Sequence, residues 1–269
     1  MYMQADAKKK KSRAMIHKPY LKGRAVSWLS AKRGGTILAF LLVSAFLFFF
    51  LGQILVFDII WLRSLINLFV IAAMCVITFN QGARLGERDV AFAEIQLAKK
   101  ESGGAVSDEA LARCFHPAKG YFTALAGAFP LVIVCLVYAL IAVPASYTLG
   151  PLPSWIAPYE KRADIGLALS YYSQSSGLEA ADILRLMVRL LVFPYVNLLG
   201  LQNSQALLWV ERLSPLLLLI APSFFGLGYA QGERYRAQVH GDIASNQRKF
   251  VRRQKKQQQK TPPKPRQLV

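Results

Sequence analysis

The longest uncharged apolar segment places the strongest constraint on the fold. Residues 36–57 hold 22 positions without a charged side chain. A helix rises about 1.5 Å per residue, so this segment can cross the roughly 30 Å hydrocarbon layer of a bilayer. Similar runs recur along the chain, whereas a buried helix in a soluble domain seldom has more than about 18 apolar residues in a row. The sequence therefore predicts an all-α, polytopic integral membrane helical bundle.

Positive charge is concentrated at the two ends of the chain. The net charge is +18, with +9 in residues 1–35, +9 in residues 232–269 and none in between. Basic residues next to membrane spans favour the cytoplasmic side. We therefore expect both ends to be cytoplasmic and the number of crossings to be even. No organellar signal is recognisable, so the plasma (cytoplasmic) membrane is the expected location.

Four predicted spans give the even number of crossings that this orientation requires. The first two, 36–57 and about 62–81, are joined so tightly that they must form an antiparallel hairpin. A helix is expected to continue to about Glu101, with a break at 102–104 and a short helix at about 107–115 capped by Ser107. The predicted organisation is a basic arm (1–35), a transmembrane hairpin (36–81), a cytoplasmic helical loop (82–120), a span (121–147), an outer-face segment (148–212), a span (213–231) and a basic tail (232–269).

Residues 178–201 are apolar but charged along one face. Glu179, Asp182, Arg185 and Arg189 recur at spacings of three, three and four, which predicts an amphipathic or re-entrant helix at the outer face. A fifth full crossing is the alternative, but it would place two arginines in the hydrocarbon. The start of the arm and the tail 248–269 are expected to be disordered because they are polar and basic.

One motif occurs twice with a constant offset of 146 residues. The pattern F-x-x-G-x-x-x-G-E-R-x-x-A begins at Phe79 and again at Phe225. It supplies the candidate packing and membrane-boundary residues, which are Gly82, Gly86, Glu87, Arg88, Gly228, Gly232, Glu233 and Arg234. Both copies stand where a predicted span leaves the membrane on the cytoplasmic side. A duplicated hairpin, 36–86 and 182–232, would explain the repeat but conflicts with the parity argument, so it stays open.

Glycines four residues apart form a flat strip that another helix backbone can approach closely. We therefore expect the two motif copies to pack near a pseudo-twofold axis, with Glu87 reaching Arg234 and Glu233 reaching Arg88. The alternative is an ordinary membrane exit, with charged side chains that extend to water and incidental glycines.

No motif for catalysis, metal binding or cofactor binding is apparent. The three histidines, His17, His116 and His240, stand in separate segments, and the three cysteines show no CxxC spacing. We therefore predict no catalytic residues, no metal site and no cofactor. A transporter would have a polar cavity near Pro130 and Pro222, where prolines can interrupt spans.

These observations favour a non-enzymatic subunit or scaffold of a membrane complex. The alternative is a small transporter or permease component with a cavity between two hairpin-like halves. The expected partners are the lipid bilayer, with anionic headgroups at both basic ends, and a membrane-protein partner or a second copy. Nucleic acid is disfavoured because the basic tail has few aromatic residues for base stacking.

Overall fold

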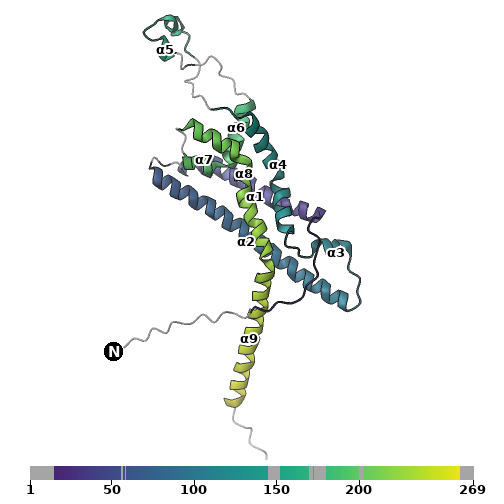
Figure 1. Cartoon of the computed structure of the whole chain (residues 1–269). Helices are drawn as coiled ribbons and strands as arrows, with labels where there is room; N and C mark the ends of the chain where they lie inside the picture. Colours follow the sequence, from purple (N-terminus) through teal and green to yellow (C-terminus); the bar gives the residue numbers. More distant parts are fainter. Residues whose placement is uncertain are drawn as a thin grey trace, which may run out of the picture. The chain divides into compact units, whose positions relative to one another are not determined.

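Every secondary-structure element in the described part of the chain is a helix. The computed structural model describes residues 15–55, 57, 59–144, 152–169, 172, 180–199 and 203–260. The α-helices are α1 (Trp28–Leu51), α2 (Ile60–Glu101), α3 (Asp108–Arg113), α4 (Lys119–Ile141), α5 (Gly166–Leu169), α6 (Ala180–Leu191), α7 (Phe193–Leu199), α8 (Ser204–Ala230) and α9 (Gly232–Lys260) (Figure 1). Two short 3₁₀ helices cover Gly52–Leu55 and Ala157–Lys161.

Four of these helices, α1, α2, α4 and α8, are long and apolar enough to cross a membrane. They correspond to the four predicted spans, but their ends differ. Helix α1 begins at Trp28 and not at Thr36, and α8 begins at Ser204 and not at Leu213. Hydropathy marks only the apolar part of a helix, and polar turns extend the hydrogen-bonded ladder beyond it. Pro130 lies within α4, and Pro215 and Pro222 lie within α8.

Helix α2 is a single element of 42 residues that ends at Glu101, where the sequence predicts the end. Gly103 follows with φ of +86°, a left-handed conformation that glycine adopts without steric cost. Ser107 then caps α3, because its side chain accepts a hydrogen bond from the backbone N–H of Ala110 at 3.3 Å.

The apolar segment 178–201, which carries charged residues along one face, is divided between α6 and α7. Helix α6 has 12 residues and α7 has 7, so neither alone reaches the length of about 20 residues that a crossing needs. Pro194 lies in the first turn of α7, where its missing N–H breaks no helical hydrogen bond. Glu179 and Gly200 lie outside the described residues.

The basic tail differs from its prediction. We expected disorder from residue 248, but α9 is helical through Lys260. Lys, Arg and Gln have high helix propensity, and no Gly or Pro interrupts residues 242–260. The block Lys8–Lys11 and residues 261–269 lie outside the described residues.

The chain divides into two compact units. The first, here called the charged unit, comprises Met1–Leu29, Phe79–Gly120 and Gly226–Val269. The second, here called the apolar unit, comprises Ser30–Thr78 and Tyr121–Phe225. Val90, Phe115 and Tyr229 form the core of the charged unit, with the last two rings stacked 5.3 Å apart. Buried aliphatic residues of α1, α4 and α8 line the apolar unit, among them Ile37, Leu41, Leu131 and Leu218.

Candidate functional site

The glycines of the repeated motif lie where α2 meets the chain around Tyr229 and Gly232 in the charged unit. A Cβ atom on Gly86 would overlap the carbonyl oxygen of Tyr229, and one on Gly232 would overlap the backbone of Gly86. A Cβ on Gly228 would overlap the carbonyl oxygen of Phe79. Gly82 is also buried. Backbone therefore meets backbone at this crossing, and any side chain at these three contact positions would force the helices apart.

The charged residues of the motif form pairs other than those expected. Glu87 lies 3.9 Å from Arg236, and Glu233 accepts a hydrogen bond from the Tyr20 hydroxyl at 3.0 Å. Arg88 and Arg234 are exposed. The expected pairs, Glu87 with Arg234 and Glu233 with Arg88, are therefore wrong. The two arginines point to water, while the N-terminal segment and the next turn of α9 supply the partners.

Glu94 and His240 are a further pair at the motif's offset of 146 residues. Glu94 Oε1 lies 2.8 Å from His240 Nε2, and Glu94 Oε2 accepts hydrogen bonds from both Nε and Nη2 of Arg236. Gly86 and Gly232 are also equivalent and in contact. Equivalent residues that meet each other are the signature of a twofold relation between two helices.

The N-terminal segment crosses these helices and bonds to α9, to α2 and to the loop that follows α3. The backbone N–H groups of Ile16, Leu21 and Gly23 donate to the carbonyls of Ala237, Ala93 and Phe115. A Cβ on Gly23 would overlap the carbonyl of Cys114, so the segment lies directly on the backbone beneath it. Burial, reinforced by Glu233, raises the pKa of Tyr20 to about 12.

A buried cation and anion lie next to the core of this unit. Lys119 Nζ is 3.4 Å from Asp89 Oδ2, and both side chains are almost fully buried. The same Nζ donates to the carbonyls of Ala112, Arg113 and Cys114 at the end of α3. The Tyr229 hydroxyl donates to Asp89 at 2.7 Å. A cation at the carbonyl end of a helix is stabilising, so this network ties α3 to α2, α4 and α8.

A cluster of charged side chains surrounds Glu211 of α8 in the apolar unit. The Glu211 side chain is 2% exposed. Its Oε1 accepts a hydrogen bond from Arg189 Nε at 2.7 Å, and its Oε2 accepts one from the Tyr138 hydroxyl at 3.0 Å. Arg185 donates to Tyr138 at 2.6 Å and to the carbonyl of Val143 at 2.7 Å. The carboxylate therefore links α4, α6 and α8.

Sequence reasoning missed this cluster because the predicted span began at Leu213, which left Glu211 outside it. A signal was present. Arg185 and Arg189 share one helix face in an apolar segment, and such charges need a nearby partner of opposite sign. Glu211 is the next acidic residue along the chain.

A second glycine contact lies in the apolar unit. Gly34 of α1 meets Gly127 of α4 so closely that a Cβ on Gly127 would overlap the Gly34 carbonyl. The two residues are 93 positions apart and belong to no repeated pattern, so local sequence patterns do not predict this contact.

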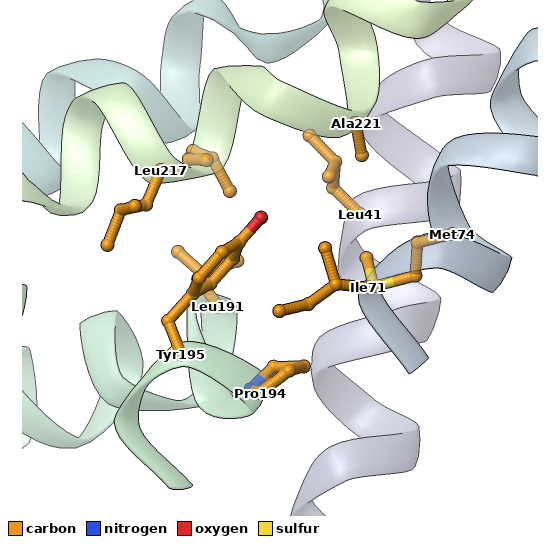
Figure 2. A pocket seen from close by; sticks show the side chains of 9 residues that line it. Leu41, Ile71, Met74, Leu191, Pro194, Tyr195, Leu217 and Ala221 are labelled. Atoms are coloured by element: carbon orange, nitrogen blue, oxygen red, sulfur yellow. The ribbon is translucent and has the colours of Figure 1, made fainter. Parts of the chain in front are cut away.

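A small cavity of about 20 Å³ lies in the apolar unit, lined by Leu41, Ile71, Met74, Leu191, Pro194, Tyr195, Leu217, Leu218 and Ala221. Figure 2 shows Leu41, Ile71 and Tyr195 converging on it. The volume matches about one water molecule. Its lining is mostly apolar, in contrast to the polar cavity expected of a transporter near Pro130 and Pro222.

No known protein family, curated protein or solved structure matches the chain.

Proposed function

We propose that the protein is a multi-pass subunit or scaffold of a membrane complex. In this proposal, α1, α2, α4 and α8 cross the membrane, both chain ends lie in the cytoplasm, and the plasma (cytoplasmic) membrane is the location. The charged unit is then a cytoplasmic platform, and its activity is binding and not catalysis. The basic residues nearest the spans contact anionic lipid headgroups and fix this orientation.

The observation that carries the proposal is the construction of the charged unit. Helix α2 contains one candidate span, and α9 follows directly after another candidate span, α8. Helices α2 and α9 meet through their backbones at Gly86 and Gly232. The N-terminal segment then bonds across α2 and α9. A loop that merely connected spans would need none of these contacts, whereas a docking platform must hold its shape to recognise a partner.

Purification from the native membrane in mild detergent tests the proposal. The measurements are the mass of the particle and the identity of its chains. We expect a second protein in fixed stoichiometry with this chain. A particle that contains this chain alone would contradict the scaffold proposal.

The Glu211 cluster favours a second candidate, a small transporter or permease component. An ionisable residue within an apolar helix often marks a substrate or ion path. If Glu211 has that role, Glu211→Gln abolishes a ligand-induced rise in thermal stability while the protein still folds. If the role is structural, the substitution lowers stability in the absence of any ligand.

A further inference from the structure

The far end of α9 carries more positive charge than membrane orientation requires. Residues 248–269 hold nine Lys and Arg and no acidic residue. The positive-inside tendency counts charges within about 15–20 residues of a span. Helix α8 ends at Ala230, so Arg252 and all later basic residues fall outside that zone. Their number and position need another explanation.

These charges are segregated on one face of the helix. At about 3.6 residues per turn, Arg248, Lys249, Arg252 and Arg253 occupy one side of α9. Ile243 and Phe250, seven residues apart, occupy the opposite side. Ile243 is 50% exposed and Phe250 is 63% exposed, and Val251 beside it is 48% exposed. The distal half of α9 is therefore amphipathic, with an uncovered apolar row.

This apolar row continues a packing surface that the helix already uses. Gly232, Arg236 and His240 recur every four residues and contact Gly86 and Glu94 of α2. The same row continues beyond His240, at spacings of three or four residues, with Ile243, Gln247 and Phe250. All three are exposed, so beyond His240 this face is available for another helix.

We propose that the distal half of α9 docks an acidic amphipathic helix of a partner protein. The apolar row would pack against apolar residues of that helix, and acidic residues at its edges would pair with the basic face. This assignment rests on the proposed scaffold function and names the chemistry of the partner.

Other occupants match this surface less well. Nucleic acid would contact the Lys and Arg side chains and leave the Phe250 row uncovered. A helix that lies on a lipid surface carries large apolar residues such as Trp, Phe and Leu along its apolar face, whereas this row holds Gln247 between Ile243 and Phe250. A second copy of α9 would bring two strongly basic helices together, and like charges repel.

The test uses the full chain in lipid nanodiscs and a designed peptide. The peptide is an α-helix of about 20 residues with leucine on one face and glutamate on both sides of it. A second peptide has the same composition in scrambled order, so its charge is equal but it has no apolar face. We expect the patterned peptide to bind at least about tenfold more tightly, as measured by fluorescence anisotropy. Equal binding of the two peptides would reduce the interaction to charge alone and overturn the proposal.

Variants locate the contact. Phe250→Ala combined with Val251→Ala is expected to weaken binding of the patterned peptide about tenfold. Ser245→Ala, at an exposed position on the basic side, is the matched control and is expected to change nothing. Unchanged binding after the double substitution would contradict the proposal.

Two competitors separate the alternatives. Vesicles with about a third anionic lipid and an oligouridine are each added to the peptide complex. We expect neither to displace the patterned peptide at equal charge concentration. Displacement by one of them would assign the surface to lipid or to RNA. A native particle with a stoichiometric partner, together with no preference between the two peptides, would overturn this inference and leave the scaffold proposal standing.

Discussion

The charged unit and the apolar unit differ in how exposed most of their ionic groups are. In the charged unit, Asp89 and Lys119 form a buried pair, but the other acidic residues on α2 and α9 are partly exposed, such as Glu87 near Arg236 and Glu233 near Tyr20. In the apolar unit, Glu211 alone gathers Tyr138, Arg185 and Arg189. The reason is solvation, because a carboxylate away from water needs several partners to offset its lost hydration, whereas partly exposed pairs share their charge with water.

The two units resemble each other in one respect. Both bring helices together at glycines, Gly86 with Gly232 in the charged unit and Gly34 with Gly127 in the apolar unit. Close backbone approach between glycines therefore occurs in both units, whereas the distribution of charge distinguishes them.

Glu211→Gln is expected to have the largest effect. Removing one member of a buried ion pair leaves uncompensated charge on the arginines and typically lowers the free energy of unfolding by about 3–5 kcal/mol. Asp164→Asn is the control, because the Arg162–Asp164 pair is more than half exposed and contributes about 1 kcal/mol or less. Chemical denaturation in detergent measures both. A similar decrease in the free energy of unfolding for the two variants would contradict the claim that the buried Glu211 cluster is more important for stability than the exposed pair.

Gly86→Leu is expected to disrupt the helix contact in the charged unit. The new side chain would overlap the backbone at Tyr229, and overpacking of this kind costs about 3 kcal/mol. Gly35→Leu is the matched control, since no atom lies within 4 Å of a Cβ at that helical glycine. Thermal unfolding followed by circular dichroism gives the comparison. Equal stability of the two variants would mean that α2 and α9 do not touch at Gly86.

The Tyr20 hydroxyl is expected to make the charged unit sensitive to alkaline pH. The pKa of Tyr20 is about 12 in the folded chain, above its ordinary value of 10.0. The folded state therefore keeps a proton that the unfolded state loses, and stability decreases as pH increases from 10 to 12. Tyr20→Phe should remove this decrease, as judged from unfolding midpoints at each pH. An identical alkaline decrease in the variant would show that another group is responsible.

Ser107→Ala should have the smallest effect. It removes the side-chain cap of α3, which typically contributes about 1 kcal/mol. We expect faster amide hydrogen exchange in α3 and no change in the apolar unit. Faster exchange throughout the chain would show that α3 is more closely coupled to the fold than its short length implies.

Much of the fold followed from local patterns. The four spans, the end of α2 at Glu101 and the Ser107 cap depend on apolar runs, on Gly103 and on a capping residue, all of which act within a few positions. The first residues of α1 and α8 were harder to predict from the sequence, because polar residues extend a helix without changing its hydropathy pattern. For the same reason, the part of α9 from Arg248 onward is predicted from the sequence to be disordered although it is helical through Lys260.

Prediction of the candidate site would have required knowledge of contacts between residues that are far apart in the sequence. The offset of 146 residues identified Gly86 and Gly232, but it could not show that Glu233 turns toward Tyr20, since the path of the N-terminal segment is set by backbone hydrogen bonds to Ala93 and Ala237. Glu211 and Arg185 are 26 positions apart on different helices. The spacing of Arg185 and Arg189 indicates a shared helix face, but it does not identify Glu211 as their partner.

Hydrogen–deuterium exchange of the intact chain in nanodiscs tests most directly whether the charged unit is a fixed platform. If it is, amides in residues 83–94 and 229–240 exchange as slowly as those of the candidate spans, because glycine contacts and the N-terminal segment hold them together. Exchange within seconds in these residues, as in an exposed helix, would contradict the account and leave an ordinary loop between spans.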